Sequence, residues 1–444
     1  MTNPAGNEGW STLSRGRIML GPDPWEGSTM TSVTRSWRHC AAAAAAALVA
    51  TLALAGAGPA GAQPGDDRTG KGGPDDAGTT TTVMTRNIYL GVDIQRPIRA
   101  TAGKTGLDAL VALGNSNVET RRIVDQTNFP RRSELLAAEI AQARPDLVGL
   151  QEVALWRSGP LELPPPFGTT PLGTTNAQHV DYDYLRILLQ DLREEGVPYK
   201  AVVVQEEMDL ESPSFLGDPT KGTLSQGRDI RLTMRDVVLL RASSTLRVLA
   251  RGSAQYDTKV PVNVGGSQLD VIRGYGWVDV AHGSAKPFRF VNTHLEAFSS
   301  LAALGQAQEL LAETVAPGRT TIIACDCNSD PLNGSTKPTD PVPVPHWQPY
   351  RFITGPGGFT DMWLTWRPAN QGWTSGLNER VDEPAPGSWT HRIDMVFARP
   401  GPGQELEVVG GEVTGDEPAA KDPVTGLWPS DHAGVVLTIR GARG

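Results

Sequence analysis

An alternation of strand-like and helix-like segments runs from about residue 81 to the C-terminus, and it restricts the fold class more than any other feature of the chain. The segment "DLVGLQEV" (146–153) is a short apolar run typical of a buried strand. The segment "RRSELLAAEIAQA" (131–143) carries apolar residues at helical spacing and stops before Arg144 and Pro145, because a proline disfavours helical backbone in the residue before it. The alternation has no internal repeat and no break in composition, so it predicts one α/β domain.

The second half of the chain continues this pattern with several more strand-like segments. "GWVDVAH" (276–282) and "FRFVNTHLEA" (288–297) predict an antiparallel pair, and "TTIIACDC" (320–327) and "HRIDMVFA" (391–398) predict further strands. Three stretches rich in Pro and Gly, at 157–181, 211–228 and 331–350, predict surface loops that shape access to a site, with plain surface loops as the alternative. We expect two mixed β-sheets packed together, with helices outside.

The first 62 residues have the pattern of an export signal. Basic Arg35 and Arg38 precede a run of small apolar residues, which ends in "AGA" at 60–62, a typical cleavage site. A transmembrane anchor is the alternative, but the run is short and ends in Gly, Pro and Ala rather than in charge. We therefore expect a secreted protein with a signal peptide at 1–62, a flexible linker at 63–80 and a folded domain at 81–444, with Met30 as an alternative start.

Charge and cysteine content exclude some classes of protein. The formal net charge is −9, so the chain does not bind nucleic acid through bulk positive charge. Only Cys325 and Cys327 remain after removal of residues 1–62. Two cysteines do not make the disulfide framework of a small exported domain, so a hydrophobic core must stabilise the fold.

The segment "ACDCNSDP" (324–331) separates into two sets of residues if it continues as a strand. Asp326 and Asn328 then face one way, and Cys325 and Cys327 face the other, toward the core. A disulfide between residues i and i+2 of a strand is strained, and zinc needs more ligands than two thiols. A deaminase-type zinc site is excluded because the two cysteines are too close together and no proline precedes them. We expect both thiols to pack in the core.

Acidic, amide and histidine side chains gather where the predicted strands end. Glu152 ends a buried strand, where a carboxylate is costly unless it is paired or binds a cation. Such hard oxygen ligands suit Mg²⁺ or a similar cation, with Mn²⁺ and Ca²⁺ as alternatives. The full set of candidate residues is Asn87, Glu152, Asn292, His294, Asp326, Asn328, Asp394, Asp431 and His432.

The order of these motifs resembles that of the endonuclease/exonuclease/phosphatase superfamily. The matching segments are "MTRNIYLG", "RPDLVGLQEV", "FVNTHLEA", "ACDCNSDP", "HRIDMVFA" and "SDHAGV". The resemblance spans about residues 81–440. It implies a four-layer α/β sandwich with the active site at the mouth between two sheets, and a metal-dependent phosphoric ester hydrolase.

The resemblance also implies a role for each candidate residue. Asn87 and Glu152 match the family's metal-binding Asn and Glu, and Asp431 is expected to join them. Asp326 and Asn328 match the pair that binds phosphate and positions or deprotonates the attacking water.

The remaining roles fall on residues near the C-terminus and on the "NTH" segment. His432 matches the terminal histidine and is expected to act as general base, oriented by Asp394. His294 is expected to act as general acid or phosphate donor, and Asn292 to bind phosphate. Two positions depart from the family pattern: Cys325 stands where a glycine is usual, and Tyr89 replaces an acidic residue, so a second metal position is in doubt.

The substrate is left open by these motifs. Export and the "NTH" histidine favour a phospholipid head group or another small phosphodiester, as in sphingomyelinase or phospholipase C. A secreted nuclease is the close alternative, and a non-catalytic binding module is a third. Five tryptophans between residues 347 and 389 fit base stacking, a lipid interface or simple core packing: Trp347, Trp363, Trp366, Trp373 and Trp389. We expect a monomer that contacts a membrane surface.

Overall fold

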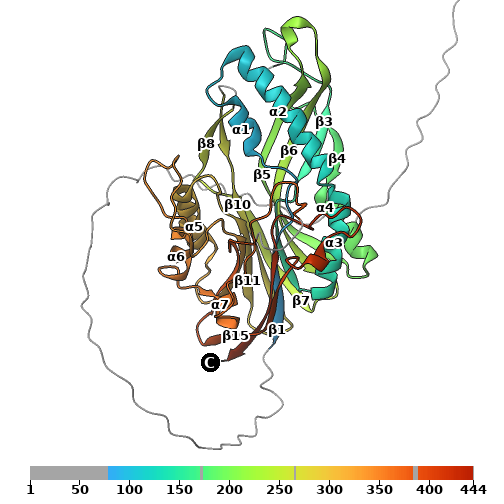
Figure 1. Ribbon diagram of the computed structural model, residues 1–444. Helices are drawn as coiled ribbons and strands as arrows, with labels where there is room; N and C mark the ends of the chain where they lie inside the picture. The colour runs from blue at the N-terminus through green and yellow to red at the C-terminus, as the bar shows by residue number, and fades with distance from the viewer. Residues whose placement is uncertain (1–78, 171–173, 265–266, 384–388, 444) are drawn as a thin grey trace, which may run out of the picture. The chain divides into compact units, whose positions relative to one another are not determined.

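Two mixed β-sheets form the centre of the folded part of the chain. A computed structural model describes residues 79–170, 174–264, 267–383 and 389–443, so the predicted signal peptide and nearly all of the predicted linker lie outside the described residues. Figure 1 shows the sheets side by side with helices on both outer faces. Within the described residues, no helix is long and apolar enough to cross a membrane.

The first sheet has eight strands in the order β15-β16-β1-β2-β6-β3-β4, with β5 paired to β6. β1 and β2 are parallel, and their neighbours β16 and β6 run antiparallel to them. The bounds are β1 Thr80–Asn87, β2 Leu147–Gln151, β3 Leu155–Gly159, β4 His179–Asp183, β5 Tyr199–Leu216, β6 Ser225–Arg241, β15 Gln404–Thr414 and β16 Gly434–Arg443.

The second sheet has six strands in the order β13-β14-β12-β11-β10-β7. β11 and β12 are parallel, and β10 pairs antiparallel with β11 as the sequence predicts. The bounds are β7 Leu246–Gln255, β10 Gly274–His282, β11 Phe288–His294, β12 Thr320–Asp326, β13 Thr360–Asp361 and β14 Asp394–Arg399. A separate hairpin joins β8 Val260–Val264 to β9 Ser267–Val271.

Three apolar clusters hold the layers together. Val83 and Leu147 of the first sheet pack with Phe290 and Ile322 of the second. A second cluster joins the outer face of the first sheet to α3 and α4, and a third joins the second sheet to α5 and α6. The helices are α1 Gln95–Thr101, α2 Gly106–Gln126, α3 Phe129–Ala143, α4 Tyr184–Glu194, α5 Ser300–Thr314, α6 Gln348–Thr354 and α7 Met362–Trp366. The predicted four-layer α/β sandwich is confirmed.

The helix ends follow from local sequence. α3 ends where the prediction placed it, because Arg144 turns into left-handed backbone before Pro145. The Asp183 side chain accepts the Arg186 N–H at the start of α4, and Ser299 does the same for Ala302 at the start of α5. Trp363 lies in the core between the sheets.

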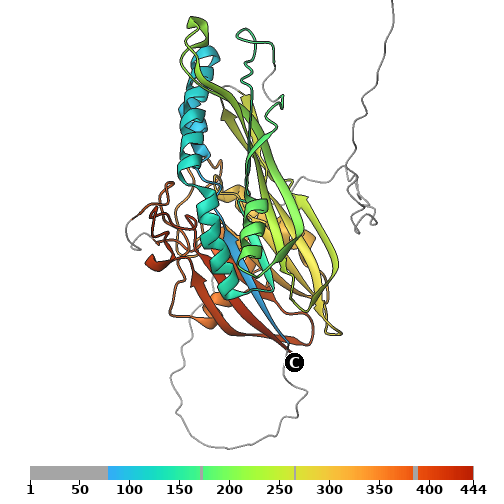
Figure 2. The same ribbon diagram turned by 90° about the vertical axis from the view of Figure 1, so that its right-hand side faces the viewer.

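The loop prediction for residues 211–228 is wrong. β5 runs to Leu216 and β6 begins at Ser225, so most of the segment extends a long hairpin, visible in Figure 2 as the green strands. Pro213 is tolerated because β5 pairs only with β6 and so lies at the sheet edge, where one side of the strand needs no hydrogen bond.

Candidate active site

Strand polarity brings the predicted site residues to one edge of the two sheets. β1 ends at Asn87, and the parallel strands β11 and β12 end side by side at His294 and Asp326. β14 runs antiparallel to β12 and begins at Asp394, which is paired directly with Asp326. His432 precedes β16 at the same edge. The register of both sheets therefore assembles side chains that are far apart in sequence.

Asp326 lies at the centre of this group. Its carboxylate accepts hydrogen bonds from Asn87 Nδ2 at 2.9 Å and from the Asn328 N–H at 3.1 Å. His294 Nε2 lies 3.4 Å from Asp326 Oδ2, and His432 Nδ1 lies 3.8 Å from the same atom. Burial and the nearby Asp394 charge raise the pKa of Asp326 to about 7.

His432 is held by a carboxylate on its Nδ1 side. Its Nδ1 lies 2.8 Å from Asp394 Oδ2, and its Nε2 lies 4.0 Å from Asp431 Oδ1. Burial by itself would lower the pKa of His432, but the carboxylates of Asp394, Asp326 and Asp431 outweigh burial and raise it well above the usual value. The carboxylates therefore stabilise the protonated form of the ring, and its Nε2 is directed away from Asp394.

The three residues predicted to bind a metal carry hard oxygen donors. Asn87 donates through Nδ2 to Asp326, which orients the amide, and its Oδ1 accepts the Tyr89 N–H. Glu152 adopts left-handed backbone (φ 59°) as the chain leaves β2, and its Oε2 accepts the Leu90 N–H at 2.8 Å. Carboxylate and amide oxygens without thiolates fit Mg²⁺.

Asp431 completes this donor set. Its side chain keeps 24% of its surface exposed. Burial raises the pKa of Asp431 to about 7; His432 lowers it, and the Glu152 carboxylate raises it further. The two carboxylates repel each other and a cation would relieve this repulsion, so Glu152, Asp431 and Asn87 are a chemically suitable ligand set.

A second group that could hold a metal consists of Asp326, Asp394 and His432, whose ligand atoms lie within 4.8 Å of one another. Here, however, the His432 Nδ1 already lies at hydrogen-bond distance from Asp394. His432 and Asp394 therefore form a hydrogen-bonded pair that can accept a proton, with Asp326 beside it, and the three residues are less suited to binding a metal ion.

Asn292, which is predicted to bind phosphate, hydrogen-bonds to the opposite sheet through its whole amide group. Its Nδ2 donates to Leu150 O at 2.9 Å and to Val237 O at 3.2 Å, and its Oδ1 accepts from Gln151 Nε2 at 2.7 Å. Both amide hydrogens are thereby committed to the opposite sheet. A side chain at Gly149 would collide with Asn292 Oδ1, so the glycine makes room for this tie between the sheets.

Asn328 has left-handed backbone (φ 44°) and is partly exposed. Its Nδ2 donates to Leu295 O, which leaves a second amide hydrogen for a ligand. Tyr89 is buried and donates its hydroxyl to Glu379 O, so it anchors a neighbouring loop and does not replace the missing acidic ligand.

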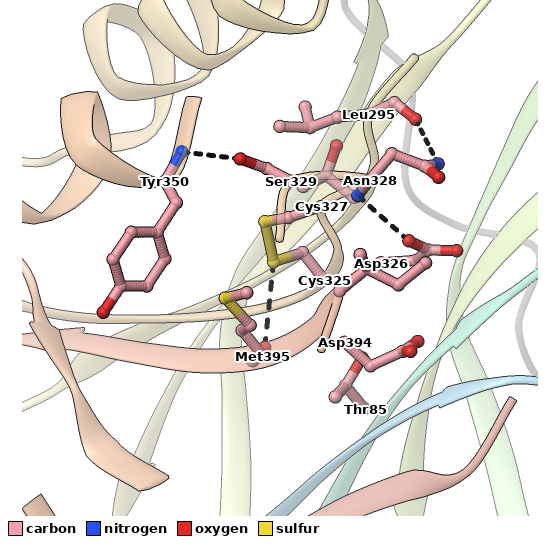
Figure 3. Close-up of a disulfide and its surroundings, with 12 residues drawn as sticks. Thr85, Leu295, Cys325, Asp326, Cys327, Asn328, Ser329, Tyr350, Asp394 and Met395 are labelled. Carbon is pink, nitrogen blue, oxygen red and sulfur yellow. Dashed lines mark hydrogen bonds between the residues drawn. A yellow bond between two sulfur atoms is a disulfide. The ribbon is translucent and has the colours of Figure 1, made fainter. Parts of the chain in front are cut away.

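Cys325 and Cys327, whose redox state the sequence leaves open, form a disulfide. β12 ends at Asp326 and the chain then turns, which brings the two Cα atoms to 5.1 Å, within the usual range for a disulfide. The expected burial is confirmed: both cysteines are fully buried in the third apolar cluster. Figure 3 shows the bridge directed away from the Asp326 carboxylate.

A group of buried charges on the far side of His294 was not predicted. Glu207, Asp236 and His294 carry potential ligand atoms within 4.8 Å of one another, and the Arg273 side chain contacts both Glu207 and His294. One sequence signal was available: Asp236 directly precedes the apolar run of β6, as Glu152 directly follows that of β2.

A buried base, an adjacent acid and a hard-oxygen ligand set define a metal-dependent hydrolase site. The sequence profile of the Endonuclease/Exonuclease/phosphatase family matches residues 115–432. The chain therefore belongs to this family, whose members hydrolyse phosphoester bonds with a metal ion. No curated protein sequence matches the chain.

Several solved structures are similar to the chain. They include the endonuclease/exonuclease/phosphatase from Beutenbergia cavernae, with 21% identity, a TM-score of 0.42, and coverage of 82% of this chain and 72% of that one. An endonuclease/exonuclease/phosphatase family protein from Bacteroides thetaiotaomicron has 14% identity and a TM-score of 0.44, and the match covers 82% of this chain and 98% of that one. TDP2 from D. rerio, solved with a single-strand DNA product, has 14% identity and a TM-score of 0.43, and the match covers 82% of this chain and 99% of that one.

Proposed function

We propose that the protein is a Mg²⁺-dependent phosphodiesterase in which His432 activates the attacking water. The observation that carries this proposal is the 2.8 Å contact between His432 Nδ1 and Asp394, beside the buried Asp326. Asp394 holds the ring with Nε2 available to take a proton from water. The surrounding carboxylates favour the imidazolium that results.

The other site residues act on the phosphate. Glu152, Asp431 and Asn87 would hold the cation, which when bound supplies positive charge to a phosphate oxygen. Asn328 offers its remaining amide hydrogen to a second oxygen, and His294 faces the same position from the opposite side of Asp326. Asp326 helps to orient the water, since it lies between the two histidines.

The charge of the loops around the site favours a small substrate over a polyanion. The loop segments 374–383 and 415–422 lead to His432, and their acidic side chains outnumber the basic ones. The acidic residues are Glu379, Asp382, Glu383, Asp416, Glu417 and Asp422, against Arg380 and Lys421. Arg96 pairs with Glu379 and Arg131 pairs with Asp422, which leaves four acids against two bases. This balance disfavours a nucleic acid more than a zwitterionic head group.

An apolar cavity of about 90 Å³, connected to the site through hydrogen-bonded residues, supports the same preference. Trp156 lines it and donates to Leu90 O at 2.9 Å, and the Leu90 N–H holds Glu152. Phe298 lines it from the other side, and its N–H donates to Glu296. The cavity would take a short apolar part of the alcohol, so we favour a phospholipid-type or other small phosphodiester.

Exposed apolar side chains on the neighbouring loops support contact with a membrane surface. Leu332 (63% exposed) and Val342 (58%) follow Asn328 in the chain, and Val424 (82%) precedes Asp431. Together with the export signal in the sequence, they support a secreted enzyme that acts at a lipid surface.

The test is a side-by-side assay of bis-p-nitrophenyl phosphate, sphingomyelin vesicles and DNA, with Mg²⁺ and with EDTA. We expect Mg²⁺-dependent turnover of the first two that exceeds turnover of DNA. Glu152→Gln should raise the Mg²⁺ concentration needed for half-maximal rate by about tenfold or more, because an anionic ligand is lost.

Glu405→Gln is the matched control, since Glu405 is exposed on β15 and should leave the Mg²⁺ dependence unchanged. Preferential cleavage of DNA would replace the lipid proposal with the nuclease alternative. Lack of turnover on all three substrates would support a binding module instead.

A further inference from the structure

Arg273 contacts His294 from the side opposite Asp326. It directly precedes β10 and is 4% exposed. Its Nη1 lies 3.0 Å from His294 Nδ1 and 3.4 Å from Glu207 Oε2, and its Nε lies 3.8 Å from Glu296 Oε2. Glu207 is held in turn by the Gly274 N–H at 3.2 Å. Two buried carboxylates therefore fix the guanidinium against the imidazole.

This contact determines which ring nitrogen of His294 carries the proton. A guanidinium only donates hydrogen bonds and keeps its charge at any physiological pH. The His294 Nδ1 must therefore present its lone pair to Arg273. A neutral imidazole with an unprotonated Nδ1 carries its hydrogen on Nε2, which is the atom 3.4 Å from Asp326 Oδ2.

We propose that Arg273 is a positioning residue that holds His294 as a neutral Nε2–H donor aimed at the substrate phosphate. This inference rests on the proposed phosphodiesterase function. It restricts His294 to one of the two roles predicted from sequence: the ring donates a hydrogen bond to a phosphate oxygen and does not deliver a proton as an imidazolium. No proton leaves Nε2 during the reaction: the water proton passes to His432, the leaving oxygen takes its proton from solvent, and the contribution of His294 is electrostatic.

The charges around His294 agree with this geometry. Burial, then Arg273 and His432, lower the pKa of His294 well below its usual value. Three acids face the ring from other strands: Glu207 on β5, Asp236 on β6 and Asp326 on β12. Burial favours the protonated form of each of them, and burial raises the pKa of Glu207 to about 7.

A metal ion at Glu207, Asp236 and His294 is the competing explanation for this cluster. Neither Asp236 oxygen has a good hydrogen-bond partner among the described residues, which would suit an ion. Arg273 already supplies a positive charge there, however, and donates to His294 Nδ1. A ring that also bound a cation through Nε2 would have to lose both protons, so the guanidinium and the ion exclude each other while this contact is made.

The deciding measurement is the tautomer of His294, read from ¹⁵N chemical shifts of histidine-labelled protein between about pH 5.5 and 8.5. We expect one protonated and one unprotonated ring nitrogen, with the hydrogen on Nε2 and no titration across the range. The resonance is assigned by its loss in His294→Gln. An imidazolium or an Nδ1–H ring in the unaltered protein would overturn the proposal.

Arg273→Met and Arg273→Lys connect the tautomer to turnover. Loss of the donor in Arg273→Met should free Nδ1 to take a proton, lower kcat by about 10- to 100-fold with a smaller change in KM, and introduce a new ionisation in the pH profile. Arg273→Lys keeps a charged donor and should restore part of the rate. Unchanged kcat and tautomer in Arg273→Met would overturn the proposal.

Arg289→Met is the matched control. Arg289 pairs with Asp279 on the same sheet, at Nε–Oδ1 2.8 Å, and makes no contact with His294. Its loss should leave the tautomer unchanged. If Arg273→Met fails to fold because Glu207 and Glu296 lose their partner, the unaltered protein and Arg273→Lys still decide the question. Absence of turnover on every phosphodiester would overturn the proposed function, while the tautomer measurement would still judge the Arg273 contact.

Discussion

Two buried histidines flank Asp326, and their partners give them opposite properties. His432 Nδ1 faces the Asp394 carboxylate, whereas His294 Nδ1 faces the Arg273 guanidinium. The pKa of His432 is raised well above the usual value and that of His294 is lowered well below it. Burial lowers the pKa of both rings, so the partner at Nδ1 decides the difference.

The comparison teaches that residue type and burial do not define a role in this site. An anionic partner stabilises the imidazolium that forms when Nε2 takes a proton, which favours the role of a base. A cationic partner makes a ring that stays neutral and donates through Nε2 without losing its hydrogen. The site thus has a base on one side of Asp326 and a fixed hydrogen-bond donor on the other.

The largest expected effect comes from removing the base. His432→Ala should lower kcat by about 10³-fold or more, because general base catalysis and its orientation are lost together. Asp394→Asn should lower kcat by about 10²-fold, since the His432 ring loses the carboxylate that stabilises its charged form. Steady-state kinetics with bis-p-nitrophenyl phosphate measures both variants, and circular dichroism checks that they are folded. Near-normal activity in His432→Ala would remove His432 from the mechanism.

A smaller effect is expected at the other histidine, and it separates the two roles directly. His294→Ala should lower kcat by about 10²-fold, the usual cost of losing one donor to a developing oxyanion. His294→Gln should recover much of that loss, because a neutral amide N–H can replace a neutral imidazole N–H. The same change at position 432 should recover nothing, since an amide is not a base.

An equal loss of kcat in His294→Gln and His294→Ala would contradict the different roles assigned to the two histidines. It would mean that position 294 must move a proton. The kinetics of the Ala and Gln variants at both positions, compared at one pH and one Mg²⁺ concentration, provide this test.

The smallest effect is expected from the disulfide on the opposite side of Asp326. Cys325→Ala with Cys327→Ala should lower the free energy of unfolding by about 1–2 kcal/mol, because the bridge closes a very short loop. It should change kcat by less than about threefold, since the Cys327 N–H still donates to Ile393 O and the Asn328 N–H to Asp326. Thermal unfolding and kinetics measure the two effects.

Reductant provides the internal control for the cysteine variant. Reductant should lower the thermal unfolding temperature of the unaltered protein toward that of the double variant. It should leave the unfolding temperature of the double variant unchanged. A large loss of activity would show that the bridge, rather than these hydrogen bonds, positions Asp326.

The sequence predicted the elements whose signals are local. β2, α3 and the β10–β11 pair have strong apolar patterns or clear end signals, and the structure has them where expected. It missed α1 and α2, whose apolar positions are interrupted by polar residues, and the extension of β5 and β6 through 211–228. Cross-strand pairing stabilises that hairpin over a composition typical of loops.

The candidate site was predicted in part for the same reason. Asp326, Asp394 and His432 stand at strand ends that the pattern located, and the structure brings them together. Asn292 lies in the predicted strand at 288–297, but only the opposite sheet shows that its amide is committed there. The Cys325–Cys327 bridge depends on where β12 ends and the chain turns, which strand alternation does not reveal.

The sequence by itself determined the fold class, the edge of the sheets where polar groups gather, and a donor set suited to a hard cation. These follow from periodicity and residue type, which act over short stretches of chain. Only the tertiary structure decided that Asp394 faces one histidine and Arg273 the other. Those contacts join residues 38 and 21 positions apart, and the charge of a buried partner at about 3 Å sets the properties of an imidazole more strongly than anything in its local sequence.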